Sequence, residues 1–149
     1  MIYIGADHRG FRLKEEIKKW LETEHYDFRD LGADSYNKED DYPDISIKVA
    51  EAVMTDNGEG IIICGSGAGA SIAANKVKGA RCGLCTFEKQ AKAARNDDDI
   101  NILCLSADAI SVEDNIKIAA IFLGTLFSSE ERHIRRINKI KEYESKISK

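Results

Sequence analysis

Short apolar runs alternate along this chain with longer amphipathic segments, and this alternation constrains the fold more than any other feature. The clearest run, Ile61 to Cys64, is continuously apolar, as expected for a central parallel strand that is covered on both faces. Comparable runs occupy residues 2–5, 26–31, 80–85 and 102–105. Because strands that alternate with helices favour a parallel sheet, we expect helices on both faces of that sheet.

The amphipathic segments predict the helices between these strands. Leu13, Ile17 and Leu21 share one helical face, and Pro43 is typical of the first turn of a helix. Small residues over 69–74 indicate a tightly packed helix, and a further helix is expected over about 87–95. The fold expected from this order is a Rossmann-like three-layer α/β sandwich with a five-stranded, doubly wound parallel sheet and a C-terminal helix.

Two pairs of residues have the spacing of a capping box, in which a hydroxyl caps the first turn of a helix. Ser111 precedes Asp114 by three residues and predicts a helix that runs to about Leu123. Ser128 and Glu131 repeat the spacing and predict the start of the last helix.

Length and composition limit the classes of protein that this chain can represent. Its 149 residues suit a single domain over 1–149, and 43% hydrophobic with 32% charged residues excludes disordered and collagen-like chains. No apolar run approaches a membrane span and the first residues lack a signal peptide, so the expected location is cytoplasmic. A net charge of −4 argues against a nucleic-acid partner, although the basic segment 131–149 suits a small anionic ligand.

The strongest candidate site is the glycine-rich segment from Cys64 to Gly69, which joins the most hydrophobic strand to a helix. Exposed backbone amides at such a turn can hold an anion, but the sequence lacks the ending of a P-loop. A thiol at this position can have a lowered pKa and act as a base, with Ser66 as its hydrogen-bond partner. The alternative is a buried cysteine that simply ends a core strand.

Other candidates surround this segment, each with an ordinary structural alternative. Asp7 and His8 end the first strand and are expected at the same sheet edge as Cys64, or else cap a helix. Arg132 and Arg136 share a helical face that suits a phosphate, or else lies in solvent. The acidic residues 97–99 favour a polar loop, and we expect no metal site there.

The remaining cysteines, Cys82, Cys85 and Cys104, are expected to be reduced and buried. Cys82 and Cys85 have the C-x-x-C spacing of redox and zinc motifs. Because both are predicted strand residues that point to opposite faces, neither function is expected.

Taken together, these motifs resemble the type B ribose-5-phosphate isomerases, a family that also includes galactose-6-phosphate and allose-6-phosphate isomerases. The resemblance spans nearly the whole chain and rests on the segments Gly5-Ala-Asp-His-Arg-Gly10, Asp41-Tyr-Pro43, Ile62-Ile-Cys-Gly-Ser-Gly-Ala-Gly69, Ser71-Ile-Ala-Ala-Asn-Lys76 and Arg132-His-Ile-Arg-Arg136. It implies interconversion of ribose 5-phosphate and ribulose 5-phosphate in the pentose phosphate pathway of carbohydrate metabolism, without metal or cofactor. It also implies a homodimer or tetramer with the site between subunits.

The resemblance further implies roles for individual residues. Cys64 takes the C2 proton and returns it at C1 through a cis-enediolate, Ser66 tunes the thiol, and the Gly65, Gly67, Ala68 and Gly69 amides hold the enediolate. Asp7, His8 and Tyr42 contact the sugar, and Arg132, His133 and Arg136 bind its phosphate.

The sequence departs from the family pattern at three acidic positions. Asp97 stands where the family has its ring-opening histidine, Asp98 replaces an asparagine, and Asp108 aligns with an arginine near the phosphate. Asp97 is then the candidate for ring opening and Asp98 for substrate binding. Two alternatives follow: an isomerase of another sugar phosphate, such as allose 6-phosphate, or a non-catalytic sugar-phosphate-binding protein.

Overall fold

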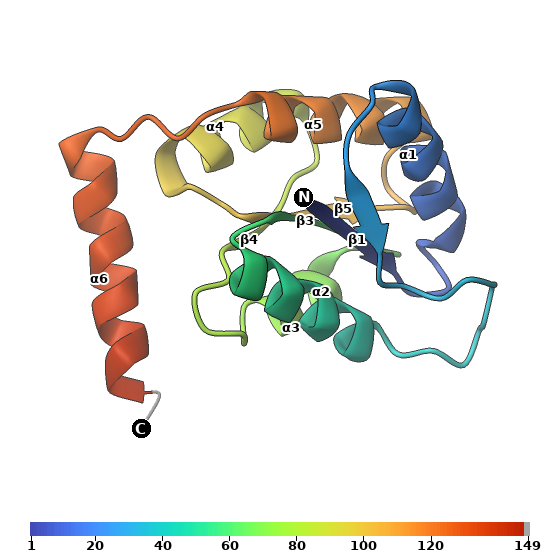
Figure 1. Cartoon of the computed structure of the whole chain (residues 1–149), viewed down its shortest axis with the longest axis horizontal. Helices are drawn as coiled ribbons and strands as arrows, with labels where there is room; N and C mark the ends of the chain where they lie inside the picture. Colours follow the sequence, from blue (N-terminus) through green and yellow to red (C-terminus); the bar gives the residue numbers. More distant parts are fainter. Residues whose placement is uncertain (148–149) are drawn as a thin grey trace.

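Five parallel strands form the centre of the structure, a computed structural model that describes residues 1–147 (Figure 1). The order across the sheet is β2-β1-β3-β5-β4, and every pairing is parallel. The strands are β1 (Ile2–Ala6), β2 (Phe28–Asp30), β3 (Glu59–Cys64), β4 (Cys82–Leu84) and β5 (Ile102–Ser106). The predicted doubly wound sheet is therefore confirmed, with the most apolar run at its centre.

Helices cover both faces of the sheet, as the alternating pattern predicts. They are α1 (Phe11–Thr23), α2 (Tyr42–Asp56), α3 (Ala68–Ala74), α4 (Glu88–Asp98), α5 (Val112–Gly124) and α6 (Glu131–Ile147). Helices α1, α4 and α5 lie over one face and α2 and α3 over the other, whereas α6 stands apart near β4 and packs mainly on α4 (Figure 1).

The two faces of β3 belong to two separate hydrophobic clusters, which explains its continuous apolar sequence. Ile61 and Ile63 pack beneath α1 and α5, while Ile62 and Cys64 face α2 and α3. Because successive strand residues point to opposite faces, a strand that is covered on both sides needs an apolar residue at every position.

The same alternation separates the two cysteines of the C-x-x-C segment. Cys82 packs with the α2 and α3 cluster and Cys85 with the α1 and α5 cluster, so the predicted opposite orientation is confirmed. All four cysteines are free thiols. None of the helices within residues 1–147 is both long and apolar enough to cross a membrane.

The predicted end of one helix is wrong. The helix expected over 87–95 continues to Asp98, so Asp97 and Asp98 lie in its last turn rather than in a loop. It ends at Asp99, whose left-handed backbone (φ 47°) and two arginine partners fix that end. The Arg95 pair is local, at i and i+4, whereas the Arg81 pair joins residues 18 positions apart and is not visible in the local sequence.

The two capping predictions have different outcomes. Ser111 Oγ accepts a hydrogen bond from the Asp114 amide at 3.1 Å, as its spacing predicts. Ser128 Oγ instead accepts from the Glu130 amide at 3.3 Å and bonds His133 Nδ1 at 2.7 Å. The buried His133 engages this hydroxyl, so the expected capping box does not form.

Candidate active site

The carboxyl ends of β1, β3 and β5 bring three loops together at one edge of the sheet. The backbone after β5 binds the backbone after β3: the Ala107 amide donates to the Cys64 carbonyl at 3.0 Å, and the Asp108 amide donates to the Gly65 carbonyl at 3.1 Å. Ser106 Oγ donates a further bond to the Gly65 carbonyl at 2.8 Å. These bonds fix the position of the glycine-rich segment relative to its neighbours.

Glycines are required in that segment for two different reasons. Gly67 has a φ of +81°, a left-handed conformation that side chains other than glycine rarely adopt. At Gly69, an added Cβ would lie 2.6 Å from the Tyr42 ring. The glycine therefore lets the first residue of α2 pack closely on α3, which places Tyr42 beside the segment.

The Cys64 side chain lies at the centre of this edge and is 7% exposed. Its thiol donates a hydrogen bond to Asp7 Oδ2 at 3.2 Å. Burial, the bond to Asp7 and the charge of that carboxylate raise the pKa of Cys64 to about 11, while hydrogen bonds with the Gly67 and Gly65 backbone lower it. The expectation of a lowered Cys64 pKa is therefore wrong.

The two carboxylate oxygens of Asp7 have different hydrogen-bond partners. Its Oδ1 accepts a hydrogen bond from the Gly10 amide at 3.0 Å, which fixes the turn into α1. Its Oδ2 faces the Cys64 thiol, and the side chain is 5% exposed. A carboxylate in this position is placed to accept the thiol proton. Asp7 therefore lies at the same sheet edge as Cys64, as expected, and also fixes the turn before α1.

His8 is paired with a residue that sequence reasoning missed. Its Nδ1 lies 2.8 Å from Asp40 Oδ1, and the same oxygen accepts a hydrogen bond from the His8 amide at 2.8 Å. The bond to Asp40 raises the pKa of His8, which burial alone would lower. The acidic stretch before α2 was the only sequence signal for this partner.

Ser66 does not contact the thiol in this arrangement. It is exposed, and its Oγ accepts a hydrogen bond from the Ala68 amide at 3.3 Å within the turn. The expected Ser66 to Cys64 hydrogen bond is therefore replaced by a local one.

The C-terminal candidate residues form a second cluster, near the start of α6 and the end of α4. His133 is 2% exposed and its Nε2 lies 3.8 Å from Asp97 Oδ1. Arg132 Nε pairs with Glu130 at 2.7 Å, and Arg136 is exposed. Within residues 1–147, no hydrogen bond or ion pair joins this cluster to the Cys64 loop.

Asp98 lies beside the same cluster but faces a different hollow. That hollow has a volume of about 420 Å³ and separates α6 from the edge strand β4. It is lined largely by apolar side chains, including Ile140, Tyr143 and Ile147. Within residues 1–147, no three His, Cys, Asp or Glu side chains are placed to hold a metal ion.

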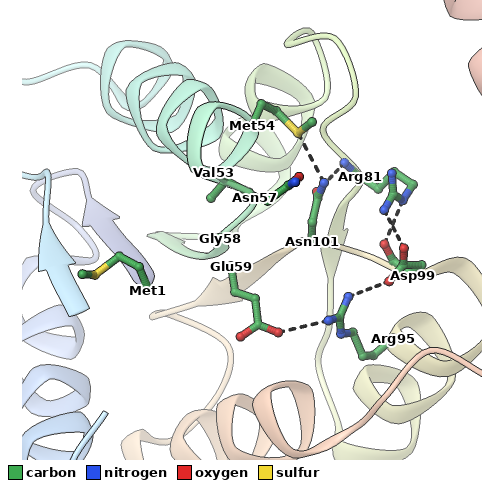
Figure 2. A pocket seen from close by; sticks show the side chains of 10 residues that line it. All are labelled: Met1, Val53, Met54, Asn57, Gly58, Glu59, Arg81, Arg95, Asp99 and Asn101. Carbon is green, nitrogen blue, oxygen red and sulfur yellow. Dashed lines mark hydrogen bonds and ion pairs between the residues drawn. The ribbon is translucent and has the colours of Figure 1, made fainter. Parts of the chain in front are cut away.

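A separate hollow of about 320 Å³ lies at the opposite, amino end of the strands (Figure 2). A chain of ion pairs crosses it: Arg81 to Asp99 at 2.8 Å, Asp99 to Arg95 at 2.7 Å, and Arg95 to Glu59 at 3.1 Å. The two arginine and two carboxylate side chains of this chain of ion pairs balance one another in charge. We interpret it as a structural network that anchors the end of α4.

Substitution of Asp99 by alanine is expected to destabilise the fold by about 1–3 kcal/mol, because both arginines lose their shared partner. Urea unfolding at one fixed protein concentration measures the change. Asp98→Ala, in the exposed neighbouring position, serves as the matched control and should change stability by less than about 0.5 kcal/mol. Equal effects of the two variants would contradict a structural network centred on Asp99.

Comparison with known proteins finds a family model and close relatives over nearly the whole chain. The model described as Ribose/Galactose Isomerase matches residues 2–140. The probable ribose-5-phosphate isomerase B of Mycoplasma genitalium is 44% identical over 145 residues, which covers 96% of this chain and 95% of that protein.

Solved structures agree with this similarity. Ribose-5-phosphate isomerase B of Clostridium thermocellum is 42% identical to this chain and has a TM-score of 0.93. The match covers 99% of each of the two chains. The Mycoplasma genitalium enzyme with bound ribulose-5-phosphate is 43% identical with a TM-score of 0.93, over 97% of this chain and 95% of that one.

Proposed function

The chain belongs to the ribose/galactose isomerase family, an aldose–ketose isomerase family, and from this premise we propose that it interconverts ribose 5-phosphate and ribulose 5-phosphate. The observation that carries the proposal is the buried pair of the Cys64 thiol and the Asp7 carboxylate, 3.2 Å apart beside the glycine-rich loop. A base beside backbone amides suits proton abstraction next to a carbonyl.

The raised pKa of Cys64 defines how the base must form. At neutral pH the side chain is a thiol, so its proton has to leave before the sulfur can accept another. The existing hydrogen bond gives that proton a path to Asp7. In the proposed first step, the S–H bond breaks, Asp7 becomes a neutral carboxylic acid, and the thiolate faces the open-chain sugar.

The thiolate then takes the C2 proton, and the electron pair of that C–H bond moves to give a cis-enediolate with negative charge on the C1 oxygen. Amides of the segment from Gly65 to Gly69 hold this oxygen, with Tyr42 and His8 as contacts for the sugar. The thiol then gives its proton to the C1 carbon. The C2 hydroxyl loses its proton and becomes the ketone, and the C1 oxygen gains a proton, either through solvent or through a group of the site. Asp7 finally returns the first proton to the sulfur. No proton is gained or lost over the cycle.

A second copy of the chain is part of the proposal, because within residues 1–147 of one copy no hydrogen bond or ion pair joins Arg132, Arg136 or Asp97 to Cys64. Helix α6 leaves apolar side chains exposed, with Ile140 at 57%, Tyr143 at 66% and Ile147 at 63%. Covering this apolar surface favours association. A second copy packed there would bring its basic cluster and Asp97 to the first copy's Cys64, where Asp97 or water would open the sugar ring.

Proton NMR of ribose 5-phosphate in D₂O with the purified protein tests the function. Formation of ribulose 5-phosphate with loss of the C2 proton signal supports the proposed isomerase. Exchange at C2 without product would show that the base works and that a step after removal of the C2 proton fails. With neither signal the proposed substrate is wrong, and allose 6-phosphate is the next substrate to test.

The pH dependence of substrate affinity should report the state of His8. Because the bond to Asp40 raises the His8 pKa above 6.5, His8 stays cationic to higher pH and favours the substrate dianion. We expect KM to rise by up to about tenfold as pH increases through that raised pKa, since one charge-assisted contact is lost.

Asp40→Asn removes the group that raises the His8 pKa and should move this rise in KM to lower pH. NMR titration of the His8 ring protons measures the pKa independently of turnover. An unchanged KM profile, with a shifted His8 titration, would place His8 outside substrate binding.

A further inference from the structure

Arg9 spans the candidate site from one loop to another. It follows Asp7 and His8 at the end of β1, and its guanidinium forms an ion pair with Asp108, which follows β5 and lies 99 residues away. Between these two loops lies Gly65, next to Cys64. A Cβ added to Gly65 would lie 2.5 Å from Arg9 Cζ and 2.8 Å from an Asp108 carboxylate oxygen, so the ion pair lies directly against the glycine-rich segment.

The Arg9 guanidinium keeps hydrogen-bonding capacity in this pair. Only one of its nitrogens, Nη2, is engaged by Asp108, and within residues 1–147 its remaining N–H groups have no partner. The Arg9 side chain is 57% exposed and that of Asp108 is 46% exposed. Exposed ion pairs contribute little to folding stability, so the pair needs another explanation.

Beside the pair lies a hollow of about 520 Å³, which we term the basic hollow. It is lined by His8, Arg9, Phe11, Arg12 and Tyr36. Tyr36 meets the rings of His8 and Phe11 edge to face, with centroids 6.3 and 6.4 Å away, and so forms an aromatic wall.

The cationic groups of the basic hollow differ in their carboxylate partners. Asp40 faces His8 and Asp108 faces Arg9, whereas Arg12 has no ion-pair partner in the described part of the chain. The charge of Asp7 also acts on His8, so the hollow attracts an anion through its donors rather than through excess charge: the spare guanidinium N–H groups of Arg9 and Arg12 suit the oxygens of a phosphate.

We propose that the basic hollow binds the phosphate group of the sugar phosphate, with Arg9 as a substrate-binding residue and Asp108 as the residue that positions it. The proposal rests on the proposed function, because Cys64 then takes the reacting end of the same molecule. The proposal also explains Asp108, whose carboxylate by itself would repel a dianion. In the ion pair, Arg9 neutralises the charge of Asp108, and Asp108 orients the Arg9 guanidinium. The second copy's arginines would approach the same phosphate from outside.

Titration of the full-length protein with inorganic phosphate, followed by ³¹P NMR, tests the hollow directly. Arg9→Gln is expected to weaken phosphate binding at least about tenfold, since a charge-assisted contact is removed. Arg29→Gln, an exposed arginine on β2, is the matched control and should leave binding unchanged. Wild-type protein that binds no phosphate, or equal affinity in wild type and Arg9→Gln, would overturn the proposal.

Steady-state kinetics then separate substrate binding from a structural effect. Arg9→Gln should raise KM for ribose 5-phosphate about tenfold with kcat within about threefold of wild type, because the contact is made before and during the reaction. A fall in kcat with KM unchanged would contradict a phosphate contact. If the wild type binds phosphate through Arg9 but does not isomerise, the proposed function fails and the anion site stands.

A charge exchange tests the positioning role of Asp108. Asp108→Arg and Arg9→Asp should each weaken phosphate binding or displace it, while the double variant Arg9→Asp/Asp108→Arg again places a paired guanidinium against Gly65. Recovery of phosphate affinity to within about threefold of wild type supports the paired arrangement. Recovery of thermal stability without recovery of phosphate affinity would reduce the pair to a structural contact and overturn the assignment.

Discussion

Cys64→Ala is expected to lower kcat for ribose 5-phosphate by about 10⁴-fold, the upper end of the range for one acid–base group, while substrate binding stays within about threefold. Among the described residues, 1–147, the Cys64 thiol is the side chain placed both against Asp7 and at the start of the glycine-rich loop. Its removal leaves the amides, His8 and Tyr42 in place. Turnover is measured by proton NMR and binding by titration calorimetry.

Cys64→Ser is the matched control for packing, because a hydroxyl fits the same space and can still donate to Asp7. Serine is a much weaker acid than cysteine, so this variant should also be inactive although its fold and hydrogen bond are retained. Substantial turnover in either variant would show that another group takes the C2 proton. Loss of substrate binding in Cys64→Ser would instead point to a disturbed site.

Mixing two inactive variants is expected to restore activity. If each site combines Cys64 of one copy with Arg132 and Arg136 of another, then Cys64→Ala and the double variant Arg132→Ala/Arg136→Ala fail in different halves of the site. In a randomly mixed dimer population about half of the dimers are hybrids, and each hybrid contains one intact site. Activity should therefore recover to about a quarter of the wild-type value.

The control for this experiment mixes Cys64→Ala with Cys64→Ser, which share the defective half and should not recover. Native mass spectrometry establishes that the subunits have exchanged. Hybrid dimers without recovered activity would contradict a site that is shared between copies, and would leave the basic cluster of α6 outside the reaction.

Much of the fold could be predicted from residues that lie close together in the sequence. The continuous run from Ile61 to Cys64 predicts a central strand, and β3 occupies the centre of the sheet. The Ser111 capping box is local, because the hydroxyl and the amide it binds are three residues apart. Periodicity and capping are reliable here because their physical causes, side-chain alternation and unsatisfied amides, lie within a single helix or strand.

The chemistry of the site depends on contacts that no local pattern contains. Cys64 and Asp7 are 57 residues apart, and only the order of β1 beside β3 brings the thiol against the carboxylate. The sequence suggested a lowered thiol pKa from the start of α3, whereas burial and the Asp7 charge reverse its direction. Electrostatic effects of this kind depend on distance and solvent exposure, which are properties of the folded chain.

The sequence by itself therefore determined the α/β architecture, the glycine-rich loop and the set of polar residues from which a site is built. Tertiary structure alone decided how they are grouped: Cys64 with Asp7, His8 with Asp40, and Arg9 with Asp108. It also decided that α6, which contains Arg132 and Arg136, stands apart from the sheet and its other helices (Figure 1). The physical reason is that helices and strands form from neighbouring residues, whereas a site forms where strand order and burial bring distant residues together.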